Sequence, residues 1–212
     1  LAVPTDTSDL PSALSYLAEA LASKRQRAFV VHRIDRDTSG ILLFAKTWPD
    51  REALVHQFIE HTPVREYLAV VRGHLREKEG TLVHYFRQEG MFQKVTKKGD
   101  PKSSRAELRY SVQHHLKGAS LVRVSLFTGL QNQIRVQMAA IGHPIIGDKK
   151  YNPEEKQERR ITRVALHAAH LAFIHPRSGD SVSFDCEPPP DFQALLAALG
   201  LGRPAAKAGT GS

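Results

Sequence analysis

The sequence predicts an α+β fold in which antiparallel strands combine with helices. Two stretches, 105–113 and 120–127, alternate polar with apolar residues, which is typical of half-buried neighbouring strands. Three others, 12–24, 50–60 and 131–141, repeat apolar residues at helical spacing. The length of 212 residues suits one large domain or two small ones, and 41% apolar residues are enough for a sizeable core.

The chain begins with a lead-in, a helix and two short β-type runs. Residues 1–11 are rich in Pro, Asp and Thr, which predicts an extended segment. Ser12 is the expected N-cap of the helix over 12–24, because apolar residues recur on one face behind it. Apolar runs at 29–31 and 40–45 are typical of short strands.

The middle of the chain contains a second helix and the first long strand. The helix over 50–60 cannot continue past Pro63, whose ring blocks the helical conformation. Residues 66–72 read as a strand that ends at Gly73. The polar stretch 74–104 has few apolar patterns, and we expect hairpins and loops there.

The last third is expected to hold the remaining elements of a single domain. Gly142, with Pro144 beyond it, is a helix-end signal for 131–141. A strand pair and a final helix are expected at 165–174, 180–186 and 192–199. Because no linker or internal repeat stands out, we expect one domain over 1–200 and a small-residue tail over 201–212.

The charge balance favours a polyanionic partner. The chain carries 30 Lys plus Arg against 22 Asp plus Glu, a formal net charge of +8, and each basic residue that meets a phosphate releases a counterion. Much of the excess lies in 94–105 and 149–163, which are equally compatible with solvated loops.

The same composition argues for a soluble, cytoplasmic protein. No apolar run approaches the roughly 20 residues of a membrane-spanning helix, and no secretory leader opens the chain. A single cysteine, Cys186, excludes an internal disulfide and a multi-cysteine zinc site.

The segment His32-Arg33-Ile34-Asp35-Arg36-Asp37-Thr38-Ser39-Gly40 is the most informative. Its polar groups stand between two apolar runs, so they must either face solvent in a turn or line a site that uses them. Asp35 lies between Arg33 and Arg36, and a nearby cation keeps a carboxylate ionised, as a nucleophile or base requires. An ordinary turn closed by Gly40 explains the same residues, and local physics does not decide between the two.

This segment resembles the central H-R-[LI]-D-x-x-T-S-G motif of the RluA-type RNA pseudouridine synthases. Three further segments resemble the same family in the expected order: Arg65-Glu66-Tyr67-Leu68-Ala69 the K-x-Y-x-A strand, 128–148 the T-G-R-x-H-Q-I-R…G-H-P-I-x-G-D block, and 166–176 the L-H-A…F-x-H-P segment. The resemblance spans roughly residues 29–192. The chain departs from it at four positions, where Arg65, Leu130, Asn132 and Gln137 replace the usual Lys, Arg, His and His.

The resemblance implies isomerisation of uridine to pseudouridine in structured RNA, either rRNA or tRNA. The reaction has no net redox change, so no metal or organic cofactor is expected. By analogy with the family, Asp35 attacks C1′ or removes the C2′ proton, Tyr67 faces the base, and Arg135 holds Asp35 ionised and oriented. Arg33 is expected to fill the space left by the flipped-out base. The further RNA contacts implied by the motifs are Thr38, Asn132, Gln133, Leu166 and His167.

The resemblance also implies the architecture, which the strand alternation permits: a mixed, mainly antiparallel central sheet with flanking helices, the pseudouridine synthase catalytic fold. The family's first strands and K-P-x-G turn are expected to precede Leu1, and no S4-like RNA-binding extension is expected in this chain. RNA is the expected partner, with no membrane and no obligate protein partner.

Two alternatives compete with this interpretation. A metallohydrolase could use His167, His170 and His175, of which the first two would share a face if that segment were helical. An RNA-binding domain with an inactive site would share both the fold and the charge. A metal assay tests the first alternative, and turnover on uridine-containing RNA tests the second.

Overall fold

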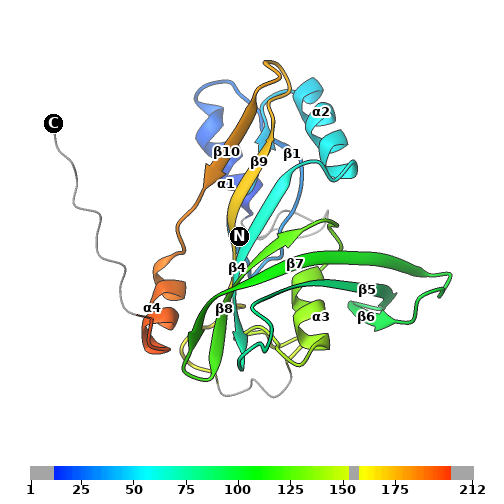
Figure 1. Cartoon of the computed structure of the whole chain (residues 1–212). Helices are drawn as coiled ribbons and strands as arrows, with labels where there is room; N and C mark the ends of the chain where they lie inside the picture. Colours follow the sequence, from blue (N-terminus) through cyan, green and yellow to red (C-terminus); the bar gives the residue numbers. More distant parts are fainter. Residues whose placement is uncertain (1–11, 153–157, 202–212) are drawn as a thin grey trace.

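A long sheet organises the molecule in the computed structural model, which describes residues 12–152 and 158–201 (Figure 1). Within those residues the strands are ordered β10-β9-β4-β8-β7-β5-β6, all neighbours antiparallel, and β2 pairs in parallel with β9. The strands are β2 (Ser39–Gly40), β4 (Val64–Arg72), β5 (Glu79–Glu89), β6 (Phe92–Thr96), β7 (Ser103–Leu116), β8 (Ala119–Leu126), β9 (Leu166–Ile174) and β10 (Ser181–Asp185). The predicted mixed, mainly antiparallel sheet is confirmed.

The main core lies on both sides of this sheet, under two helices. Ile134 and Met138 of α3 (Gln133–Ala140) join it, as do Phe192, Leu195 and Leu196 of α4 (Pro190–Ala198). The two helices cover opposite faces of the sheet, because Leu166 lies with α3 around one pocket whereas the ring of His167 lies 6.2 Å from that of Phe192 in α4. Consecutive strand residues point to opposite faces.

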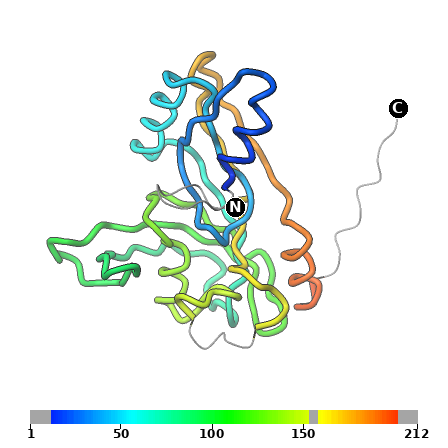
Figure 2. The backbone as a smooth tube through the Cα atoms, turned by 180° about the vertical axis from the view of Figure 1, so that it is seen from behind, coloured from blue at the N-terminus to red at the C-terminus, as the bar shows by residue number. Residues whose placement is uncertain are grey.

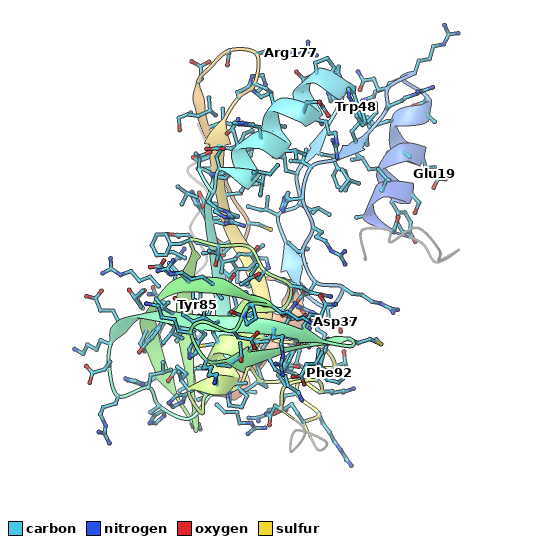
Figure 3. All side chains as sticks on the ribbon, turned by 90° about the vertical axis from the view of Figure 1, so that its right-hand side faces the viewer. Glu19, Asp37, Trp48, Tyr85, Phe92 and Arg177 are labelled. Atoms are coloured by element: carbon cyan, nitrogen blue, oxygen red, sulfur yellow. The ribbon has the colours of Figure 1, made fainter. Side chains whose placement is uncertain are left out.

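A smaller core forms where the N-terminal part packs on the end of β9 and β10 (Figure 2). It contains β1 (Phe29–Val30), β3 (Phe44–Ala45) and α2 (Trp48–Ile59), with Leu54 of α2 buried against Leu171 and Phe173 of β9. Figure 3 shows Trp48 and Arg177 at this end of the molecule and Tyr85 and Phe92 at the other. The segment between β1 and β3, which carries Asp35, therefore leaves the small core and returns to it, and on the way it meets β9 through β2.

The helix-end residues identified in the sequence agree with the structure. The first helix, α1 (Ala13–Ala22), begins at the predicted N-cap Ser12, which exchanges capping hydrogen bonds with Ser15. Gly142 follows the end of α3 with φ +80°, a conformation that glycine adopts without strain. Each of these helix ends depends only on residues within one helical turn, so it can be recognised in the sequence.

The polar stretch 74–104, expected to form hairpins and loops, contains a hairpin, because β5 and β6 are antiparallel neighbours with Glu89 opposite Phe92. Strand β5 also pairs with β7, from Glu79 to Arg87. The prediction for the apolar run 40–45 was wrong, because Gly40 ends β2 beside β9 whereas Phe44 and Ala45 form β3 beside β1. The partner β9 lies far along the chain, and no local pattern identifies it.

No helix in the described ranges, 12–152 and 158–201, is long and apolar enough to cross a membrane. The expected lead-in over 1–11 and all but the first residue of the expected tail lie outside the described residues, as do positions 153–157 of the basic segment 149–163.

Candidate active site

A pocket of about 370 Å³ opens between the end of α2, strand β4, the start of α3 and the segment 32–38. Asp35, Tyr67 and Arg135 all line it, although 100 residues separate the first from the last. The volume falls within the range of ordinary ligand pockets, about 300–1,000 Å³. The fold thus brings together the three side chains that the motifs singled out.

Asp35 sits on a tight turn at the mouth of this pocket. The N–H of Thr38 donates to the carbonyl of Asp35 at 2.9 Å, and the Asp35 side chain is 24% exposed. Burial raises the pKa of this carboxyl, while the guanidinium groups of Arg135 and Arg33 oppose that rise. The ionised form therefore depends on its arginine neighbours.

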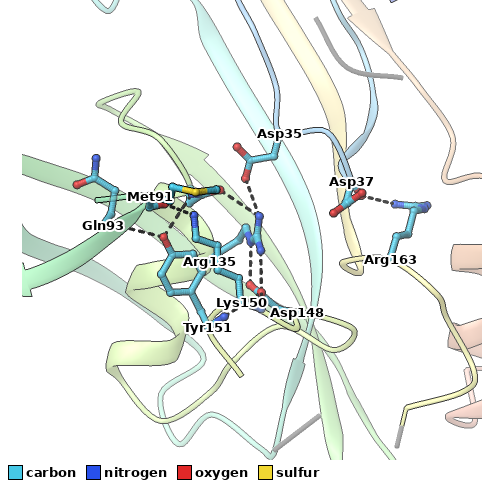
Figure 4. Close-up of polar contacts among 10 residues, drawn as sticks. Asp35, Asp37, Met91, Gln93, Arg135, Asp148, Lys150, Tyr151 and Arg163 are labelled. Carbon is cyan, nitrogen blue, oxygen red and sulfur yellow. Dashed lines mark hydrogen bonds and ion pairs between the residues drawn. The ribbon is translucent and has the colours of Figure 1, made fainter. Parts of the chain in front are cut away.

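Arg135 holds its main contacts with another carboxylate, Asp148 (Figure 4). Its Nε and Nη2 donate to the two Asp148 oxygens at 2.8 and 2.7 Å, whereas Nη1 reaches Asp35 at 3.4 Å and Asn132 Oδ1 at 3.0 Å. Although burial disfavours the cation, Asp148 and Asp35 together raise the pKa of Arg135. The expectation that Arg135 aims Asp35 needs one correction: the two-pronged pair is with Asp148, and Asp35 receives a single longer contact.

Asp148 is fully buried and fixed by the backbone after it. Its Oδ1 also accepts the N–H groups of Lys150 and Tyr151 at 2.9 and 3.0 Å. Tyr151 lies under the Arg135 guanidinium, 5.4 Å from ring centroid to Cζ, and its hydroxyl accepts from Gln93 N of β6 at 3.1 Å. Asp148 belongs to the Gly-Asp pair of the quoted motif, and that pair was the signal through which its role could have been found.

Tyr67 forms an inner wall of the pocket. It is 9% exposed, and burial raises its pKa to about 12, so the phenol is neutral at neutral pH. Arg65, two residues earlier in β4, faces the same pocket because alternate strand residues share a face. The K-x-Y spacing of the motif thus delivers one basic and one aromatic side chain to a single site.

Most residues expected to contact RNA line the pocket: Arg33, Thr38, Asn132, Gln133 and Leu166. Arg33 is exposed, which suits a group that enters an RNA stack. The Gln133 side chain is occupied within the protein, because Oε1 accepts from Thr128 Oγ1 and Leu130 N while Nε2 donates to Glu107 O. Gln133 therefore shapes the loop before α3.

His167 does not reach the pocket, in contrast to the expectation. It is 1% exposed on the opposite face of β9 from Leu166, with Nδ1 3.0 Å from Ser39 Oγ and Nε2 2.9 Å from Cys186 O. Both ring nitrogens are satisfied inside the protein. Its position beside β2 shows that it holds the motif segment against β9.

Two of the residues that depart from the motif, Gln137 and Leu130, also have structural roles. Gln137 is fully buried, and its amide nitrogen donates to Leu82 O at 3.0 Å, outside the pocket. Leu130 lines the pocket and packs against the small cluster of Phe86, Ala106 and Val136. The metal-site alternative required a helix, but His167 and His170 lie in strand β9, and among the described residues no three His, Cys, Asp or Glu side chains come together in an arrangement that could hold a metal ion.

Comparisons with known proteins place this geometry in context. The family profile described as RNA pseudouridylate synthase matches residues 2–140. The ribosomal large subunit pseudouridine synthase D of Zymomonas mobilis is 42% identical over 179 residues, covering 82% of this chain and 56% of the relative. The ribosomal large subunit pseudouridine synthase C of Pasteurella multocida is 36% identical over 201 residues, covering 89% of this chain and 60% of the relative. The chain thus spans less than two thirds of the length of these relatives.

Solved structures agree with the sequence comparison. The human protein RNA Pseudouridylate Synthase Domain Containing 1 has a TM-score of 0.68 at 25% identity, over 82% of this chain and 74% of that one. The human protein RNA Pseudouridylate Synthase Domain Containing 4 has a TM-score of 0.73 at 21% identity, over 90% and 83%. The second likeness concerns the fold alone.

Proposed function

Because the chain belongs to the RluA-type family of RNA pseudouridine synthases, we propose that it isomerises uridine to pseudouridine in RNA. The observation that carries the proposal is that the carboxylate of Asp35 lies in a pocket and contacts the buried Arg135, whose guanidinium is held in place by two hydrogen bonds to Asp148. The relatives from Zymomonas and Pasteurella are named for the large ribosomal subunit. We therefore propose rRNA as the substrate, with tRNA as the alternative outcome of the test.

The reaction breaks the bond between N1 of the base and C1′, turns the base, and joins C5 to C1′. Asp35 either attacks C1′ or removes the C2′ proton, and either role requires the ionised carboxylate. Arg135 supplies this requirement, because its cation opposes the rise of the Asp35 pKa caused by burial. Nothing is oxidised and no leaving group is lost to solvent, so we expect the reaction to need no cofactor.

A target uridine must leave the RNA stack to reach this site. The pocket volume of about 370 Å³ suits a single flipped-out nucleoside. Tyr67 then faces the base as a neutral phenol, which can stack on it and donate a hydrogen bond. Arg33, exposed at the pocket rim, takes the place of the base in the stack.

The remaining basic surface supports RNA binding beside the pocket. In the part of the chain that the structure describes, no ion pair involves Lys97, Lys98 or Lys102, at the turn between β6 and β7. Two arginines in the described part of 149–163 are instead engaged within the protein, since Arg160 pairs with Glu158 and Arg163 with Asp191. We therefore assign the phosphate contacts to segment 94–105.

The test is Asp35→Asn, with Asp37→Asn as its matched control. Asp37 lies two residues away and is exposed, and its backbone carbonyl rather than its carboxylate meets Arg163 (Figure 4). We expect Asp35→Asn to abolish pseudouridine formation while RNA affinity stays within a few fold, and Asp37→Asn to retain activity. Pseudouridine mapped across cellular RNAs with and without the protein identifies the substrate.

Three outcomes contradict parts of the proposal. If Asp35→Asn retains a tenth or more of the parent rate, Asp35 is not the catalytic carboxylate. A parent protein that binds RNA without turnover supports the inactive RNA-binding domain instead. Pseudouridine that changes only in tRNA refutes the assignment to rRNA.

A further inference from the structure

The second arginine of the pocket, Arg65, is a buried cation without a counter-charge among the residues that the structure describes. It is 9% exposed, and its Nε and Nη2 lack hydrogen-bond partners within the described residues. No carboxylate among those residues pairs with it, whereas Arg135 has both Asp148 and Asp35. Burying a charge and its donors without partners is expensive, so a site that maintains this arrangement is suited to a ligand that completes it.

The surroundings of Arg65 are neutral or apolar. The Phe58 ring lies 5.8 Å from its Cζ, and Tyr67 beside it is a neutral phenol. His32 lines the same pocket, and burial followed by the charge of Arg65 lowers its pKa to about 4, so it is also neutral. The positive potential of Arg65 is therefore directed into the pocket with little internal compensation.

Gly129 provides the space for this guanidinium. A Cβ built on Gly129 would lie 2.7 Å from Arg65 Nη1, closer than real contacts allow. Because the displaced atom is the far end of a flexible side chain, a larger residue at 129 would move the guanidinium rather than the backbone. The Thr-Gly pair of the motif thus shapes the Arg65 position.

We infer that Arg65 is a further catalytic residue, which donates to the carbonyl oxygens of the target uracil and balances the negative charge of the base once it is detached. The inference rests on the proposed function. When the N1–C1′ bond breaks, its electron pair stays with the base, which becomes a uracil anion. Asp35 loses its charge in the same step, either by bonding to C1′ or by accepting the C2′ proton.

One negative charge therefore moves from Asp35 to the base by either route. When C5 bonds to C1′, the electron pair for the new bond comes from the base, and the Asp35 carboxylate or the C2′ proton is restored. The C5 proton is then lost and N1 gains one, which completes the isomer. Arg135 stabilises the charge at its origin, and Arg65 stabilises it at its destination. A donor that acts on charge present only during reaction lowers the barrier rather than the substrate affinity.

The test compares Arg65→Gln and Arg65→Lys on an RNA that the parent modifies, containing either uridine or 5-fluorouridine at the target. Single-turnover consumption of the target nucleoside is followed by mass spectrometry of digested RNA. We expect Arg65→Gln to lower the rate on uridine by about 100- to 1,000-fold, as removal of one oxyanion donor does, with RNA affinity within a few fold. Arg65→Lys keeps the charge and should stay within about tenfold of the parent.

The fluorine distinguishes a chemical from a structural role. It withdraws electrons and stabilises the detached base, so the loss caused by Arg65→Gln should shrink by tenfold or more on 5-fluorouridine. Equal losses on both substrates, or a rate within threefold of the parent on uridine, overturn the inference. A parent that leaves uridine unchanged refutes the proposed function instead, so the two failures are distinct.

Gly129→Ala provides a second variant that keeps the Arg65 side chain. We expect Gly129→Ala to lower the rate on uridine by less than Arg65→Gln does, with an unchanged circular dichroism spectrum. When the two substitutions are combined, the rate should fall little further than in Arg65→Gln alone. Losses that multiply in the double variant would show that Gly129 does not act through Arg65, and would overturn the assigned geometry.

Discussion

Asp148 offers the sharpest test of the site, because it meets Arg135 from the side away from Asp35. Replacing it with Asn preserves shape but removes the charge, and one Arg135 N–H then faces an amide N–H₂ instead of a carboxylate oxygen. Arg135 is 8% exposed and Asp148 fully buried, so water cannot repair the pair.

The magnitude follows from these contacts. Breaking a buried ion pair by removing one partner costs about 3–5 kcal/mol. Arg135 retains Asn132 at 3.0 Å and Asp35 at 3.4 Å, so we expect the lower end, about 3 kcal/mol less free energy of unfolding. A misplaced Arg135 also fails to aim Asp35, and we expect kcat to fall about 100-fold.

Asp191→Asn is the matched control. Arg163 contacts Asp191 with the same two-pronged geometry, at 2.7 and 2.9 Å, but the Asp191 side chain is 45% exposed. Such a surface pair contributes about 1 kcal/mol or less. Urea unfolding and kcat are measured for both variants. Equal stability losses would refute the argument from burial, and an unchanged kcat in Asp148→Asn would refute the argument from aiming.

Three other perturbations test separate parts of the reasoning. Arg135→Lys should lower turnover far more than RNA binding. It should also move the acid limb of the curve of rate against pH to higher pH, since weaker pairing lets the pKa of Asp35 rise further. A pH profile equal to that of the parent would contradict this pairing. The pKa of His32 is about 4 in the folded protein and 6.5 in the unfolded chain, so the unfolded chain binds more protons between these pH values. The free energy of unfolding should therefore fall by up to about 3 kcal/mol as the pH drops from 6.5 to 4. His32→Gln should remove this pH dependence, and parallel curves of stability against pH for both proteins would refute it. Replacing the three unpaired lysines of 94–105 with Ala should reduce the slope of log affinity against log salt by about 2, at roughly 0.7 per phosphate contact; an unchanged slope would mean that the segment is a solvated loop.

The sequence by itself determined the local elements and the composition of the site. Ser12 and Gly142 mark helix ends because their effects act within one turn of the chain. The order of four motifs indicated that Asp35, Tyr67 and Arg135 belong together, and the pocket contains all three. Strand alternation also predicted the antiparallel pair of β7 and β8, whose loop is short.

Only the tertiary structure decided which partner each polar group takes. Arg135 could have paired fully with Asp35, but the chain after α3 returns and places Asp148 against the other edge of the guanidinium. His167 and Leu166 are neighbours in the sequence, yet the pleat of β9 sends one to α4 and the other to the pocket. That no carboxylate in the described ranges pairs with Arg65 could not be read from the chain either, because it depends on every segment that packs around this side chain. Hydrogen bonds and ion pairs depend on distances of a few ångströms between distant segments, and no local pattern of side chains encodes those distances.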